Sequence, residues 1–325
     1  MSEVLQQQSQ AVVAVQGLRK RYPGQRIAAL AGLDFALAPG RSLAIVGESG
    51  SGKTTAAMCI AKLAAADGGQ VLLSGRDLLG AGARETVALR REFGIVLQNP
   101  LTALDPRQRI WRSVAEPLEV HEPSLPKTAL RERALAMLSR VGLSEAMAER
   151  LPHQLSGGQL QRAVIARALV LQPRFVILDE PTSALDVSVQ AQVLNLLCDL
   201  REELQLSYLF ITHNLALVEI LAHEVLVMYA GAVVERGPVH QVFANPRHPY
   251  TAELLAAVPG SGSAFAMGAA ELAPAAADGG CPYRLRCARA ALASDPARCS
   301  QPVPPTTGSA AHQAACHFPL GASEQ

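Results

Sequence analysis

The sequence predicts an α/β fold built on a largely parallel sheet, and three observations support this fold class. Short strand-like runs alternate with helical stretches from about residue 11 to residue 258. The strand-like runs are continuously apolar, as in strands that are covered on both faces of a sheet. Apolar residues make up 49% of the chain and charged residues 18%, which is enough apolar material for a sizeable core.

The elements of this domain follow in chain order. A buried strand is expected at Leu43–Val46, followed by a glycine-rich loop and a helix at Thr54–Leu63. Further apolar runs of strand length lie at Ile95–Leu97, Phe175–Leu178 and Tyr208–Ile211. Helical composition and period at 131–140 and 159–171 predict a mostly helical lobe at about 100–172, inside a main domain at 8–257.

The composition changes after the main domain. Residues 258–280 are rich in Gly, Ala, Ser and Pro, which predicts a flexible linker. Residues 281–318 follow as a small Cys-rich C-terminal tail. This segment is too short to bury much of a core, and we expect it to need a staple such as a metal.

The glycine-rich loop, Gly47–Thr54, fits the phosphate-binding pattern G-x-x-x-x-G-K-[ST]. Glycines let backbone N–H groups wrap phosphates, and the following helix adds its dipole. Lys53 would contact the β- and γ-phosphates, and the Thr54 hydroxyl would bind Mg²⁺. The predicted nucleotide-binding residues are Gly47, Glu48, Ser49, Gly50, Ser51, Gly52, Lys53, Thr54 and Thr55.

Two carboxylates end the apolar run Phe175–Leu178. We expect Asp179 to hold Mg²⁺, through water, and Glu180 to polarise the attacking water. Carboxylates after a strand also occur as plain strand ends. The sequence Pro181–Asp186 after them favours the catalytic interpretation, as the following resemblance explains.

Leu155–Gln159 reads LSGGQ, downstream of the phosphate loop on the same chain. With both motifs and the segment 179–186, the chain resembles the ATPase subunits of ATP-binding cassette (ABC) transporters. The resemblance implies a RecA-like core with an antiparallel β subdomain and a helical subdomain. It also implies that two cassettes sandwich ATP between them, so that a single chain is nearly inactive.

The same resemblance assigns roles to single residues. It implies that Gln98 contacts Mg²⁺ and water and senses the permease, that His213 contacts the γ-phosphate and supports Glu180, and that Tyr22 stacks on adenine. It implies that Asp186 lies on a loop that crosses the cassette interface. A last set would face the γ-phosphate held by the partner cassette: Ser156, Gly157, Gly158 and Gln159.

The C-terminal part narrows the resemblance. Asn245–Thr251 and the pattern Gly280–Cys287, with Cys299, Pro302 and His312–Cys316, are similar to the ATPases of oligopeptide, dipeptide and nickel importers. The implied partners are a second ABC ATPase, more often a different chain, two permease subunits and an extracytoplasmic solute-binding protein. The implied location is peripheral, on the cytoplasmic face of the cell membrane, with permease helices docking near 99–109.

Four of the six cysteines, Cys281, Cys287, Cys299 and Cys316, lie in the C-terminal segment. Clustered cysteines in an intracellular protein indicate a metal before disulfides. Their irregular spacing suits zinc poorly and suits an Fe–S cluster better. Some family members hold a [4Fe–4S] cluster at these positions, and zinc or a metal-free, partly oxidised segment stay open.

The totals exclude some classes of function. With 29 basic and 28 acidic side chains, the net charge of +1 gives no sign of a nucleic-acid partner. We expect neither a signal peptide nor a membrane-spanning helix, and hence a soluble, intracellular chain. A soluble ABC ATPase acting on DNA or ribosomes would carry long insertions or two cassettes, and a metabolic P-loop kinase has no use for LSGGQ. The transported solute, whether peptide or nickel, is chosen by the partners.

Overall fold

The computed structural model of the chain describes residues 11–25, 27–257, 280–292, 295–302, 307–309 and 311–321. The described residues divide into two compact units, each discontinuous in sequence. Of the described residues, unit 1 contains 11–14, 36–41 and 72–210, and unit 2 contains 15–25, 27–35, 42–71 and the described residues from 211 to 321. Both units mix helices and strands, as the sequence predicts.

Five described strands of the larger sheet lie in unit 2, in the order β11-β12-β10-β9-β3, where β11 is Thr307–Gly308 and β12 is Gln313–Ala314. The strand β3 (Ser42–Val46) is buried along its whole length and pairs in parallel with β9 (Glu224–Tyr229), with Leu43 opposite Glu224. The strand β10 (Ala232–Pro238) then pairs with β9 in antiparallel fashion. The carboxyl end of β3, Val46, leads directly into the phosphate loop that begins at Gly47.

Three longer strands of the other sheet lie mainly in unit 2, in the order β2-β1-β4: β1 (Val13–Lys20), β2 (Leu30–Leu37) and β4 (Gly68–Leu73). The last residues of β4 pair in antiparallel fashion with the short strand β5 (Arg76–Asp77). The helices of unit 2 are α2 (Lys53–Ile60), α9 (Leu215–Leu221), α10 (Val239–Ala244), α11 (Pro249–Ala256) and α12 (Ala288–Leu292), with a 3-10 turn η3 (Pro296–Ser300).

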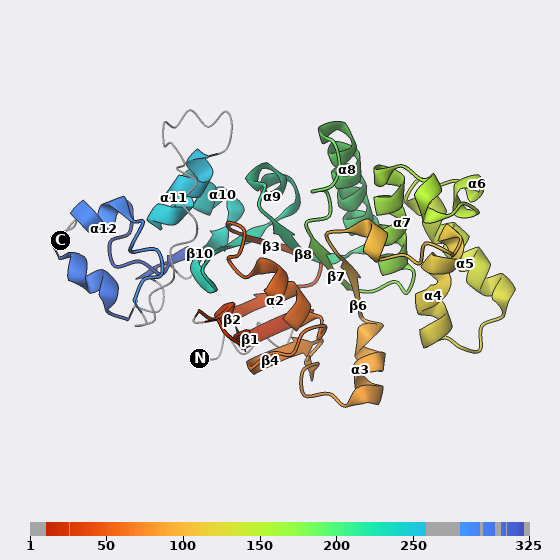
Figure 1. Ribbon diagram of the computed structural model, residues 1–325, viewed down its shortest axis with the longest axis horizontal. Helices are drawn as coiled ribbons and strands as arrows, with labels where there is room; N and C mark the ends of the chain where they lie inside the picture. Colours follow the sequence, from red (N-terminus) through yellow and green to blue (C-terminus); the bar gives the residue numbers. More distant parts are fainter. Residues whose placement is uncertain are drawn as a thin grey trace. The chain divides into compact units, whose positions relative to one another are not determined.

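Unit 1 carries β6 (Phe93–Val96) and β7 (Phe175–Asp179), which pair in parallel, with β8 (Ser207–Thr212) next to β7. Its helices include α3 (Ala83–Arg90), α8 (Val187–Leu204) and a group that lies between β6 and β7 in the sequence. Figure 1 shows this group together: α4 (Ile110–His121), α5 (Lys127–Arg140), α6 (Glu145–Ala148) and α7 (Gly157–Leu169), with short turns η1 (Pro100–Thr102) and η2 (Pro152–Gln154).

The helix α4 shows why this segment is helical. Ile110, Val114 and Leu118 recur four residues apart, on one face of the helix, and all three are buried. The helices α4, α5 and α7 pack on one another. They lie in the stretch for which the sequence predicts a helical lobe.

The predicted elements are present, with shifted bounds. The helix expected at Thr54–Leu63 begins one residue earlier and ends at Ile60, because Lys62 adopts a left-handed φ of 52° that a helix cannot continue. The helix expected from residue 159 begins at Gly157. None of the described helices is both long and apolar enough to cross a membrane.

The prediction of a separate Cys-rich tail is not supported. Described parts of the C-terminal segment pack within unit 2, where β12 (Gln313–Ala314) pairs with the edge of β10, Ala314 opposite Glu235. A sheet edge offers unpaired N–H and C=O groups, so a short segment gains order by pairing with it. Residues 258–279 of the predicted linker lie outside the described residues.

Candidate functional site

The phosphate loop, Gly47–Thr54, connects the buried strand β3 to the helix α2 in unit 2. Gly47 needs to be glycine. Its φ is 153°, and a Cβ there would lie 2.2 Å from the backbone oxygen of Met228. The loop can therefore close against the neighbouring strand only without a side chain at this position. Ser49, Gly50 and Thr54 are exposed, so the outer part of the loop faces solvent.

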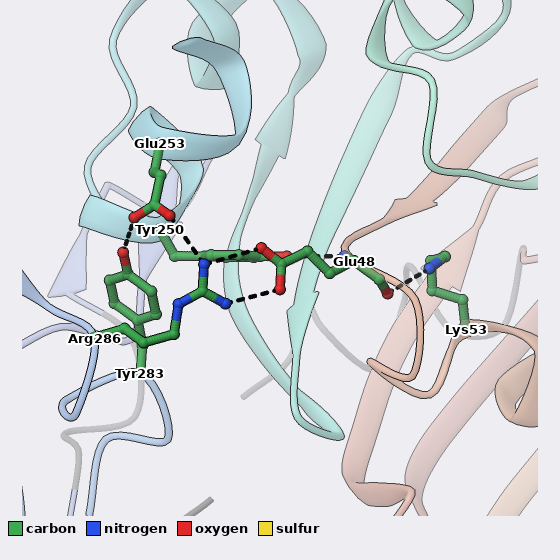
Figure 2. A network of polar contacts seen from close by, with 6 residues as sticks. All are labelled: Glu48, Lys53, Tyr250, Glu253, Tyr283 and Arg286. Carbon is green, nitrogen blue, oxygen red and sulfur yellow. Dashed lines mark hydrogen bonds and ion pairs between the residues drawn. The ribbon is translucent and has the colours of Figure 1, made fainter. Parts of the chain in front are cut away.

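Lys53, the first residue of α2, turns back over the loop. Its ammonium donates hydrogen bonds to the backbone oxygens of Gly47 and Glu48, each at 2.8 Å, and the residue is only 6% exposed. Figure 2 shows the bond to Glu48. The charge is thus fixed beside the loop and the N-terminal end of α2, where a phosphate is also favoured.

Glu48 is anchored on its other side by the C-terminal part of the chain. Its N–H donates to the Tyr250 hydroxyl at 2.9 Å, and its carboxylate accepts two hydrogen bonds from Arg286. The sequence analysis missed these partners of the loop. No local pattern could reveal them, since Glu48 and Arg286 are 238 positions apart.

Two more predicted site residues lie in unit 2. Tyr22 follows β1 in a turn and is 36% exposed, with the Lys20 ammonium 5.4 Å from its ring centroid. His213 follows β8 and is exposed, just before Asn214 caps α9 by accepting a hydrogen bond from the Ala216 N–H. Both residues are therefore exposed to solvent.

Unit 1 brings Gln98 and Glu180 together. The parallel register pairs Val96 with Leu178, so the residues two positions after this pair, Gln98 and Glu180, lie at the same carboxyl edge. The Gln98 side-chain amide accordingly donates a hydrogen bond to Glu180 Oε2 at 2.9 Å. Asp179, on the last position of β7, is 1% exposed.

The backbone at Glu180 is unusual. Its φ of 46° lies in the left-handed region, which is rarely adopted by residues other than glycine. Such conformations cost about 1–3 kcal/mol and cluster at functional sites. The Glu180 side chain, which starts from this backbone conformation, accepts the hydrogen bond from Gln98.

The signature segment, Leu155–Gln159, starts the helix α7. Ser156 caps this helix: its hydroxyl accepts from the Gln159 N–H at 3.4 Å, and the Gln159 side chain accepts from the Ser156 N–H at 3.0 Å. This reciprocal capping box fixes the helix start. Gly158 packs against α8, because a Cβ there would lie 2.4 Å from a methyl carbon of Val189.

Asp186 has a structural role that the sequence analysis did not consider. It caps the helix α8, accepting hydrogen bonds from the Val189 N–H at 3.0 Å and the Ser188 hydroxyl at 2.7 Å. The bond from the Val189 N–H is the main cause that lowers the pKa of this carboxyl. Asp186 therefore stays charged and holds the helix start in place.

The four C-terminal cysteines line one small cavity of about 10 Å³ in unit 2. All four are free thiols, and all but the half-buried Cys287 are buried. Burial raises the pKa of Cys281 to about 11 and that of Cys316 to about 12. As the described side chains stand, no three of them form a group that could hold a metal ion.

Thiols are the usual ligands of Fe–S clusters, but a volume of about 10 Å³ holds no more than a single water, so the cavity as it stands cannot contain a cluster. His317 also lines the cavity, and its Nε2 is buried with no hydrogen-bond partner among the residues that the structure describes. Buried polar atoms rarely stay unpaired, and sulfur atoms of an Fe–S cluster accept hydrogen bonds. Because binding needs thiolates, loading would have to displace the thiol protons and move the side chains toward the group.

Comparisons with known proteins agree with these motifs. A family model described as ABC transporter matches residues 30–183, and one described as oligopeptide/dipeptide transporter, C-terminal region, matches residues 234–292. The dipeptide transport ATP-binding protein DppF of Escherichia coli K12 is 47% identical over 250 residues, 74% of this chain and 75% of DppF. The oligopeptide transport ATP-binding protein OppF of Salmonella typhimurium LT2 is 42% identical over 301 residues, 90% of this chain and 89% of OppF.

Solved structures extend the comparison. The dimeric structure of an ATP-binding cassette in a post-hydrolysis state, bound to ADP and Pi, is similar with a TM-score of 0.64 and 29% identity. The match covers 70% of this chain and 98% of that one. The structure of the cassette protein CbiO1 from Clostridium perfringens matches with a TM-score of 0.65 over 72% of this chain and 91% of that one, also at 29% identity.

Proposed function

The chain belongs to the ABC transporter ATPase family, in its oligopeptide and dipeptide transport branch, and on this premise we propose that it hydrolyses ATP to energise an importer of dipeptides or oligopeptides. The observation that carries the proposal is the contact of Gln98 with Glu180 at 2.9 Å. It joins a candidate general base to a side chain that can report on the permease. Catalysis and transport would meet at this pair.

Each part of the site has a distinct task in this proposal. Tyr22 stacks on adenine, and the phosphate loop with Lys53 holds the triphosphate. Oxygen donors of Thr54, Gln98 and Asp179 suit Mg²⁺, which supplies charge neutralisation on the phosphates when bound. Glu180 accepts a proton from the attacking water, and His213 contacts the γ-phosphate.

The signature segment implies that the working assembly contains two cassettes. The start of α7 offers the N-terminal dipole of a 13-residue helix to the γ-phosphate of a second cassette. The partners in this proposal are therefore a second ABC ATPase, two permease subunits and an extracytoplasmic solute-binding protein. The chain would lie on the cytoplasmic face of the cell membrane, bound through the permease.

Uptake in cells identifies the cargo. In source cells whose sole copy of this chain carries Glu180→Gln, we expect uptake of labelled dipeptides or oligopeptides to fall to background, because the motor cannot turn over. Uptake of labelled nickel is measured in the same cells, because nickel is the alternative solute that the resemblance to related importers leaves open. Loss of nickel uptake with normal peptide uptake would contradict the peptide cargo and favour the alternative.

We also propose that Cys281, Cys287, Cys299 and Cys316 hold a [4Fe–4S] cluster. Their convergence on one cavity with His317, whose Nε2 has no partner in the described part of the chain, supports this, although the described thiols as they stand form no ligand group. The group would staple the C-terminal segment, and the proposal assigns it no step in ATP hydrolysis.

Metal analysis separates the alternatives for the cysteines. Protein purified without oxygen is expected to contain iron and acid-labile sulfide in equal amounts, with a visible absorption band that bleaches on reduction. A Cys316→Ser variant should lose iron, whereas Cys198→Ser on α8 serves as the matched control and should keep it. Zinc in place of iron, or neither metal, would contradict the cluster.

A further inference from the structure

The side chain of Glu48 points out of the phosphate loop toward the C-terminal segment (Figure 2). Arg286 meets it with two bonds, Nη1 to Oε2 at 2.9 Å and Nη2 to Oε1 at 3.3 Å. Paired contacts of this kind fix orientation as well as distance. The Arg286 side chain is 13% exposed and the Glu48 side chain 20% exposed, so water screens the ion pair only partly.

Arg286 is held from its other side as well. Its Nη2 donates to Glu253 Oε1 at 3.0 Å, and the other oxygen of Glu253 accepts a bond from the Tyr283 hydroxyl. The guanidinium carbon lies 5.9 Å from the ring centroid of Tyr229 and 5.8 Å from that of Tyr283. Hydrogen bonding to Glu48 is the main cause that raises the pKa of Arg286, so the guanidinium stays charged.

Glu48 is thereby fixed at three points. Its carboxylate binds Arg286, its N–H binds the Tyr250 hydroxyl at 2.9 Å, and its C=O accepts from the Lys53 ammonium at 2.8 Å. A continuous chain of polar contacts thus leads from the phosphate-binding lysine to Arg286. Arg286 directly precedes Cys287, which lines the cysteine cavity.

We propose that Arg286 is a positioning residue for ATP binding, through which the C-terminal segment holds the phosphate loop in its binding conformation. The inference rests on the proposed ATPase function and adds a residue to it that lies outside the nucleotide-binding motifs. A loop that is already ordered binds its ligand without a further ordering cost. Arg286 also neutralises Glu48, a carboxylate that would otherwise repel the triphosphate.

The ordering of the phosphate loop and the neutralisation of Glu48 predict different effects for different variants. Arg286→Gln removes the anchor and leaves the Glu48 charge uncompensated, so the KM for ATP should rise about 10- to 100-fold while kcat changes little. Arg286→Lys keeps the charge but loses the paired geometry, and it should restore part of the affinity. The double variant Glu48→Gln/Arg286→Gln lacks the repelling charge and should bind ATP more tightly than Arg286→Gln alone.

These parameters are measured in the assembled importer with its partner cassette and permease subunits, and Tm is recorded for every variant. Arg298→Gln is the matched control, because Arg298 is an exposed arginine in the same segment, and its KM should stay near wild type. An unchanged KM in folded Arg286→Gln, or a double variant weaker than the single one, would overturn the inference. A wild-type importer without ATPase activity would instead refute the proposed function.

Discussion

Glu180→Gln is expected to bind ATP and to lower turnover by about 10²–10⁴-fold, the contribution typical of a general base. An amide cannot accept the proton of the attacking water, although it has the same size as the carboxylate. Gln98 can still donate to the new amide oxygen, so the contact at the end of β7 and its geometry are kept. The stalled protein should accumulate as a dimer with ATP trapped between two cassettes.

Turnover is measured as the rate of phosphate release. Dimerisation is measured as the increase in molecular mass when ATP is added. The control is Glu219→Gln, which changes an exposed glutamate on α9 and should leave both results at the wild-type level. If Glu180→Gln hydrolysed ATP at the wild-type rate, Glu180 would not be the base.

Lys53→Met should weaken ATP binding about 10- to 100-fold, the effect of losing hydrogen bonds to a charged group. Lys53 is 6% exposed, and its ammonium is fixed by two backbone oxygens of the loop, so its position is set before a phosphate arrives. Methionine fills similar space without the charge. A fluorescent ATP analogue measures the dissociation constant at equilibrium.

Lys127→Met supplies the comparison for this variant. Lys127 is exposed at the start of α5, and its loss removes one positive charge from unit 1. Equal weakening in both variants would show that only the total charge of the chain matters. Unchanged affinity in Lys53→Met would contradict the role of the loop.

Local patterns were enough to predict the strands and helices around the motifs. The strands β3 and β7 are buried at all five positions, and four of the five residues in each are apolar, so the sequence itself shows a continuous apolar run. The contact between Gln98 and Glu180 also follows from such patterns, because parallel strands end at one edge. Motif and strand position together are therefore enough to place Gln98 and Glu180 at one edge of the sheet.

Contacts between distant segments could not be predicted in this way. Arg286 and Glu48 are charged residues in unrelated segments, and nothing near either of them indicates that they pair. The pairing of β12 with β10 involves only two residues of β12, too few to give a strand pattern. The caps at Ser156 and Asp186 were within reach, since both residues are typical at the position before a helix.

The most direct test of the central claim is ATP-driven accumulation of a labelled peptide in vesicles that contain the complete importer. Accumulation is expected with the wild-type chain and ATP in the cytoplasm-facing compartment, and none with Glu180→Gln. Equal accumulation with both chains would contradict the claim that hydrolysis at this site energises import.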